Sequence, residues 1–128
     1  MGSLFLPDVP FRRRFGKLPE DWVRREDGRL ALRTAPACRW KIGQPPSGLE
    51  AVISHRRREP DGEVFITLRC QSAAEDSYLD GGDALQAYNS PLSGKEAFCE
   101  LECHAPAASL APGDGDGQDV EIEIRYGT

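Results

Sequence analysis

Hydrophobic and polar residues alternate in several short stretches of this chain, with the period of two that is typical of a β-strand. Val64, Ile66 and Leu68 alternate with other residue types, and Ile122 and Ile124 repeat the pattern near the C-terminus. Because successive side chains of a strand point to opposite faces, these patterns predict strands with one apolar and one solvated face. The strands predicted in this way cover residues 29–34, 38–42, 49–55, 63–70, 84–88, 96–103 and 119–126.

Turn-forming residues separate these stretches. They include Asp27-Gly28, Pro60–Gly62 and Gly113–Gly117. Glycine allows a positive φ angle, and aspartate can form a hydrogen bond with its own backbone, so both residues favour tight connections. The pieces between the turns are too short for helices of ordinary length. The sequence therefore predicts an all-β fold, an antiparallel β-sandwich.

Residues 1–28 are less regular, because Pro7, Pro10 and Pro19 interrupt any long element. Residues 18–22 are expected to form a short helical turn that begins at the proline. We expect the rest of this segment to be an irregular arm that covers the sandwich. A chain of 128 residues without a linker-like stretch suits a single domain over residues 1–128.

The charge of the chain limits its partners. Its 21 acidic and 16 basic residues give a net charge of −5, which argues against nucleic acid or an anionic membrane surface as the main partner. The basic triplets at 12–14 and 56–58 are expected to flank turns. No run approaches the ~20 apolar residues of a membrane-spanning helix, and the N-terminus lacks the order of residues seen in a secretory signal. We expect a soluble, cytoplasmic protein.

The four cysteines lack the close pairs of a zinc site and are expected to be reduced core residues. Cys99, Cys103 and His104 lie near one another in sequence, but along a strand the two sulfur atoms would be roughly 13 Å apart, too far to share one ion. Residues 113–119 lack the spacing of a calcium loop. We therefore expect no metal and no cofactor.

Two carboxylates stand out in the strand predicted at 96–103. Glu100 and Glu102 share one face, whereas Cys99, Leu101 and Cys103 form the opposite, apolar face. A partly buried carboxylate beside another is expected to have a raised pKa and to accept a proton more readily near neutral pH. The alternative is that both residues belong to the solvated face of an ordinary sheet.

A series of short motifs runs in order from Leu18 to the C-terminus. Its members are Leu18-Pro19, Trp22, Asp27-Gly28, Trp40–Gly43, Tyr78, Asp80–Gly82, Tyr88, Glu100–Glu102, Pro106 and Leu110–Gly113. In order and spacing this series resembles the C-terminal half of the galactose mutarotase-like (aldose 1-epimerase) superfamily, in particular a bacterial subgroup. The resemblance implies part of an antiparallel β-supersandwich with a sugar site on one sheet.

The resemblance also implies roles for the two glutamates. In the family's epimerases a late glutamate acts as general base on the anomeric hydroxyl, and this position matches Glu100 best. Glu102 would then contact sugar hydroxyls, although the two roles are open to exchange. Lys41 is expected to point into the same groove and to bind a hydroxyl or a carboxylate. The alternative is that Lys41 has a solvated ammonium group and only packs its aliphatic stem on the sheet.

Tyr78, Asp80 and Tyr88 carry groups suited to sugar binding, because a ring can stack on a pyranose while a hydroxyl or carboxylate binds its rim. The alternatives are packed tyrosines and a turn aspartate. His104 follows the glutamate strand on the same face and is expected to be a residue of the strand end rather than a catalytic acid.

The family's catalytic histidines lie in an N-terminal half that has no counterpart in this sequence. Catalysis of an aldose 1-epimerase type is therefore doubtful, and the first hypothesis is a carbohydrate-binding domain. The alternative is a non-enzymatic interaction module that pairs through exposed sheet edges. The partners expected are a sugar, with a homodimer or a separate N-terminal half completing the sheets.

Overall fold

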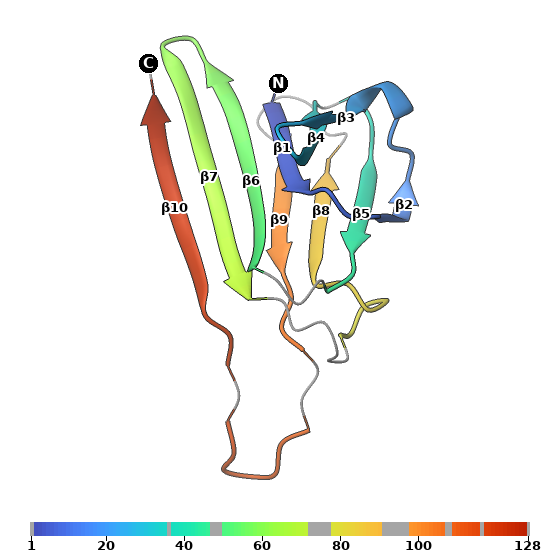
Figure 1. Cartoon of the computed structure of the whole chain (residues 1–128), viewed down its shortest axis with the longest axis vertical. Helices are drawn as coiled ribbons and strands as arrows, with labels where there is room; N and C mark the ends of the chain where they lie inside the picture. Colours follow the sequence, from blue (N-terminus) through green and yellow to red (C-terminus); the bar gives the residue numbers. More distant parts are fainter. Residues whose placement is uncertain are drawn as a thin grey trace.

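The computed structural model describes residues 2–35, 37–46, 50–71, 78–90, 98–106, 109–115 and 117–127. These residues form ten strands and one short 3₁₀ turn, and all strand pairs are antiparallel. The strands make two sheets that pack face to face (Figure 1). This arrangement confirms the predicted all-β, sandwich-like fold.

The two sheets differ in size. Sheet A has six strands in the order β10 (Val120–Gly127), β7 (Gly62–Gln71), β6 (Glu50–Glu59), β1 (Gly2–Pro7), β4 (Arg29–Thr34) and β3 (Val23–Glu26). Sheet B has four strands in the order β2 (Arg12–Gly16), β5 (Trp40–Gln44), β8 (Leu85–Asn89) and β9 (Cys99–Cys103).

The N-terminal segment is not the irregular arm that the sequence predicted. It contributes β1, β2 and β3, and β1 lies inside sheet A between β6 and β4. Leu4 and Leu6 of β1 are fully buried. A short apolar run can be a complete central strand, and the prolines fall at or beyond its end rather than within it. The predicted helical turn is confirmed as the 3₁₀ turn η1 (Glu20–Trp22), which follows Pro19.

The core lies between the two sheets. Trp40 and Ile42 of β5 point inward, with no more than 1% of their surface exposed, and pack with Leu4, Leu32 and Ile53 of sheet A. Lys41, between the two, points to the outer face because side chains alternate along the strand. The alternation of β5 thus both fills the core and presents a charged group on the outer face of sheet B.

Two of the predicted tight turns are confirmed, whereas the third, Gly113–Gly117, includes a residue outside the described ranges. Asp27 and Gly28 have φ angles of 53° and 73° and connect β3 to β4, as expected for a two-residue hairpin loop that needs two positive φ angles. Pro60 and Asp61 connect β6 to β7. All four cysteines are free thiols. No helix among the described residues is both long and apolar enough to cross a membrane.

Sheet A extends beyond sheet B. The last strand of sheet B, β9, packs across β6 and β7, so it leaves β10 uncovered (Figure 1). Four residues of β10, here called the β10 apolar row, continue the core-facing side of the sheet and yet are 40–69% exposed: Val120, Ile122, Ile124 and Tyr126. The apolar face of the larger sheet is therefore open to solvent at this end.

Candidate functional site

The outer face of sheet B brings several predicted site residues together. Lys41 lies opposite Tyr88, and Tyr88 lies opposite Glu100. The next row on this face lies two residues further along each strand and consists of Gly43, Gln86 and Glu102. Glu100 and Glu102 thus share the face of Lys41 and Tyr88, as the pleat predicted, while Leu101 packs against the core on the other side.

Glu102 is held by two donors. The Nζ atom of Lys41 donates to one carboxylate oxygen at 3.0 Å, and Nε2 of His104 lies 2.9 Å from the other. Nδ1 of His104 lies 3.2 Å from the backbone carbonyl oxygen of Asp83. Lys41 offsets the charge of Glu102, as the sequence suggested.

The pKa of Glu102 is lowered, not raised as predicted. Partial burial acts to raise this pKa, but hydrogen bonds from His104 and Lys41, together with their charges, outweigh it. The sequence argument expected partial burial and the neighbouring carboxylate to raise the pKa, with Lys41 available to offset the repulsion. The donor that it did not expect is His104, which lies just beyond the end of β9 and stabilises the carboxylate together with Lys41.

A second carboxylate, Asp83, is completely buried beside this pair. Its oxygens accept hydrogen bonds from Arg12 Nη2 at 2.8 Å and from Gln86 Nε2 at 2.9 Å, and Arg14 Nε lies 3.6 Å away. A Cβ atom on Gly43 would lie 1.9 Å from the carboxylate of Asp83. The missing side chain of Gly43 therefore creates the space in which Asp83 lies.

Asp80 connects the buried carboxylate to the surface. It lies in the predicted turn with a φ angle of 54°, accepts a hydrogen bond from Gln86 Nε2 at 2.8 Å and pairs with Arg14 at 3.1 Å. The hydrogen bond from Gln86 is the main cause that lowers the pKa of Asp80; slight desolvation opposes it, and the charges of Arg14 and Lys41 add to it. The side chains of Asp80, Asp83 and Gln86 thus form one network.

Aromatic rings lie next to the polar cluster. The ring of Tyr88 contacts Phe15 edge-on at 5.7 Å and Phe98 at 5.8 Å between centroids. The Tyr88 hydroxyl accepts a hydrogen bond from Arg39 Nε at 3.3 Å. A register shift between Arg13 and Phe15 puts Phe15 opposite Lys41, on this face. Phe15 and Phe98 are 39% and 47% exposed. The guanidinium of Arg39 lies over the Phe15 ring at 4.6 Å from its centroid, so Phe98 supplies the more open apolar surface beside the charged groups.

Two other predicted site residues differ in exposure. Glu100 is exposed and lies opposite Tyr88. Tyr78 is only 8% exposed, which leaves little of its ring to stack on a ligand. The structure thus joins Lys41, Glu102 and Asp80 through the network, places Tyr88 and Glu100 beside it, and buries Tyr78.

Four members of the network were not singled out from the sequence: Arg12, Arg14, Asp83 and Gln86. Arg12 and Arg14 belong to a triplet expected to flank a turn, whereas they lie in β2 and reach across the sheet. Burial of Asp83 depends on a glycine in another strand, which no local pattern reveals. The one available signal was the second aspartate at the end of the Asp80–Asp83 turn.

The charges in this network balance. Three cationic groups, Arg12, Arg14 and Lys41, pair with three carboxylates, Asp80, Asp83 and Glu102. No group of three or more histidine, cysteine, aspartate or glutamate side chains is placed to hold a metal ion within the described ranges. The chemistry that the face offers is hydrogen bonding beside an aromatic surface.

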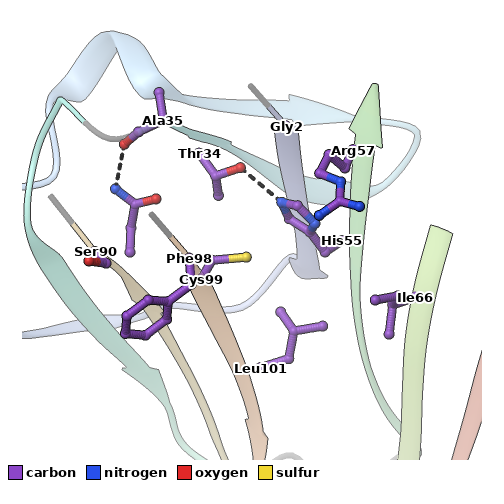
Figure 2. Close-up of a pocket in the computed structure, with 11 residues that line it drawn as sticks. Gly2, Thr34, Ala35, His55, Arg57, Ile66, Ser90, Phe98, Cys99 and Leu101 are labelled. Carbon is purple, nitrogen blue, oxygen red and sulfur yellow. Dashed lines mark hydrogen bonds between the residues drawn. The ribbon is translucent and has the colours of Figure 1, made fainter. Parts of the chain in front are cut away.

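A separate cavity of about 280 Å³ opens between the sheets at the end where the chain begins (Figure 2). In it, Nε2 of His55 lies 2.9 Å from the Thr34 hydroxyl. Burial, helped by the charge of Arg57, lowers the pKa of His55 to about 4, and burial raises the pKa of the Cys99 thiol. Near neutral pH both groups are therefore uncharged, and the cavity contains none of the predicted site residues.

A hollow of about 350 Å³ on the outer face of sheet A is lined by four arginines: Arg24, Arg33, Arg56 and Arg58. Arg33 and Arg56 lie over the rings of Trp22 and Phe5, and Arg24 and Arg58 pair with glutamates at 3.0 and 3.5 Å. Because these four arginines have partners within the chain, we interpret the basic cluster as part of the charged outer face of sheet A.

Comparison with known proteins gives no match that bears on this site. No family model matches the chain, and no curated protein and no solved structure matches it either. The likeness to the aldose 1-epimerase superfamily therefore stays a prediction made from the motif series.

Proposed function

We propose that the outer face of sheet B binds a neutral, polyhydroxylated small molecule such as a monosaccharide. The observation that carries this proposal is the hydrogen-bonded chain Lys41–Glu102–His104 beside the ring of Tyr88 on one sheet face. Sugar sites combine such charged donors and acceptors with an aromatic surface, because a sugar has hydroxyl groups on its rim and C–H groups on its faces.

The balance of charge supports a neutral ligand. Each cation of the network already has a carboxylate partner, so a charged ligand that bound the network itself would have to break an ion pair; Arg39, beside the network, lies over the Phe15 ring instead. A hydroxyl group can instead donate to Glu102 or Asp80 while it accepts from Lys41 or His104. The exposed ring of Phe98 extends the apolar surface along which a sugar ring would lie, while Arg39 lies over the ring of Phe15.

The geometry favours binding over catalysis. Epimerisation at the anomeric centre needs one group that removes a proton and another that supplies one. The lowered pKa of Glu102 makes it a weak base, and His104 contacts the same carboxylate. The role of general base that the resemblance gives to Glu100 stays a prediction, which a mutarotation assay of the protein and of Glu100→Gln tests.

Calorimetric titration with a panel of monosaccharides tests the binding proposal. The Glu102→Gln and Tyr88→Ala variants are expected to lose at least about tenfold in affinity, since each removes a charged acceptor or a stacking surface. Glu121→Gln is the matched control, because Glu121 is an exposed glutamate on sheet A. Equal affinities in all three variants, or no binding by the unchanged protein across the panel, would contradict the proposal.

A second candidate function, the protein-interaction module, is favoured by the β10 apolar row. Exposed contiguous apolar surface commonly marks an interaction site. Among the described residues, β9 and β10 are also the last strands of their sheets and offer backbone groups for pairing.

A further inference from the structure

Two cysteines occupy matching positions near the ends of β7 and β9. Cys70 is the last residue but one of β7, and Cys103 is the last residue of β9. Both strands run in the same direction and finish at the same end of the sandwich (Figure 1). Cys70 is 5% exposed and belongs to the core, and Cys103 is partly buried and packs against that core from the other sheet.

The spacing along the two strands brings these cysteines opposite each other. Ile66 of β7 and Cys99 of β9 line the same cavity between the sheets. Four residues further along each strand, the same core-facing rows reach Cys70 and Cys103. The two thiol groups lie within hydrogen-bonding reach of each other, so this contact spans the two sheets.

The backbones of the two strands are also close. Packed sheets usually lie about 10 Å apart, whereas Cα atoms of β7 and β9 approach to within 8 Å. A disulfide requires a separation of about 4.4–6.8 Å between its two Cα atoms. Only a small movement of one strand is therefore needed to join them.

We propose that Cys70 and Cys103 form a reversible disulfide that joins sheet A to sheet B, with a small-molecule disulfide such as oxidised glutathione as the oxidant. The partly exposed Cys103 sulfur loses its proton and attacks the oxidant, which releases one thiol and leaves a mixed disulfide. The Cys70 sulfur then loses its proton and attacks the Cys103 sulfur, which displaces the second thiol. Two electrons and two protons thus pass from the protein to the oxidant.

The surroundings of the pair suit a structural bond. Burial, together with the hydrogen bond and charge of Cys70, raises the pKa of Cys103 to about 12. Because the thiolate is the attacking species, exchange is slow near neutral pH. Once formed, the bond closes a loop that includes β8 and connects β7 to the strand that contains Glu102. Closing a loop in this way stabilises the fold by restricting the unfolded chain.

Oxidation of the unchanged protein tests the pairing. The folded protein is incubated with oxidised glutathione, its remaining thiols are alkylated in denaturant, and peptide mapping identifies the linked cysteines. We expect Cys70 to be linked to Cys103 within one chain. The urea midpoint should rise on oxidation and return to its original value after reduction with dithiothreitol.

Cys99→Ala is the matched control, because Cys99 lies on the same core-facing row as Cys103 but at the other end of β9. This variant should keep both the bond and the rise in the urea midpoint, whereas Cys70→Ala should lose both. If Cys70→Ala fails to fold, the peptide map of the unchanged protein still decides the pairing.

The proposal is overturned if the folded protein forms no bond between Cys70 and Cys103 under conditions in which the urea-unfolded chain forms disulfides. A bond to a different cysteine, or a Cys70–Cys103 bond found only between copies of the chain, would overturn it as well. A rise in the urea midpoint that persists in folded Cys70→Ala would contradict the stabilising role of the bond.

Discussion

The carboxylate of Asp83 occupies the space that a side chain at Gly43 would fill. Gly43 lies in β5, whereas Asp83 lies just before the start of β8. A Cβ atom on Gly43 would lie 1.9 Å from an oxygen of Asp83. Asp83 in turn positions Gln86 and Arg12. The absence of one side chain therefore determines how the whole polar network is built.

Gly43→Ala is expected to lower the free energy of unfolding by about 1–3 kcal/mol, as other overpacked sites do, because the methyl group displaces a buried carboxylate from its partners. Urea denaturation measures this change. Gly115→Ala serves as the control, since no atom lies within 4 Å of a Cβ atom there, and it should change stability by less than about 0.5 kcal/mol. Equal stability of the two variants would show that Asp83 does not need the space.

Lys41→Met should raise the pKa of Glu102 towards its ordinary value, because it removes one hydrogen bond and one positive charge while keeping the apolar stem. Because the pKa of Glu102 is lower in the folded state, its ionised carboxylate stabilises the fold at pH values above the pKa of the unfolded state. This stabilisation is lost as the pH falls through the pKa of the folded state. The variant should lose up to about 1 kcal/mol of stability at neutral pH, as a partly exposed pair would.

The side-chain carboxyl carbon of Glu102, followed by ¹³C NMR during a pH titration, reports this pKa directly. Arg69→Met, which breaks an exposed ion pair with Glu121 on sheet A, should leave the titration of Glu102 unchanged. An unchanged titration in Lys41→Met would mean that His104 alone stabilises the carboxylate.

His55 should make the protein sensitive to acid. Its pKa is about 4 when folded, against 6.5 for an unperturbed histidine. The unfolded chain therefore binds a proton between these values while the folded chain does not, so stability falls as the pH drops from 6.5 to 4. The full loss is about 3 kcal/mol.

Unfolding of His55→Gln by urea at several pH values tests this expectation. The variant should lose most of the dependence between pH 6.5 and 4, whereas His104→Gln, which retains His55, should keep it. A pH profile of His55→Gln that matches the unchanged protein would contradict the burial of a neutral imidazole beside Thr34.

Local periodicity predicted most strands, because alternation is a property of neighbouring residues. It gave β4, β7 and β10 nearly in full, and it put Glu100 and Glu102 on the same face. It ended β6 too early, at His55, because the triplet 56–58 was expected to flank a turn, whereas the strand continues to Glu59. It failed for the N-terminal segment, where the prolines were taken to break elements although β1 ends at Pro7. A short strand without alternation cannot be distinguished from a loop until its partners on both sides are known.

Only the part of the site that lies on a single strand could be predicted from the sequence. The network of Asp83 depends on Arg12, from a strand some seventy residues earlier in the chain, and on the small size of Gly43. Long-range pairing of this kind leaves no periodic signal. The expectation of a raised carboxylate pKa did not hold for Glu102, because it left out the hydrogen bond from His104, which lies beyond the end of the strand; Lys41 was expected to bind a carboxylate and does.

Amide chemical shifts during a monosaccharide titration test the central claim most directly. The binding proposal predicts concentration-dependent shifts for Gln86, Glu100 and Glu102 and for Lys41 across the sheet, with β10 unaffected. Signals from these residues that stay unchanged across a broad panel of sugars, or shifts confined to other surfaces of the molecule, would contradict it.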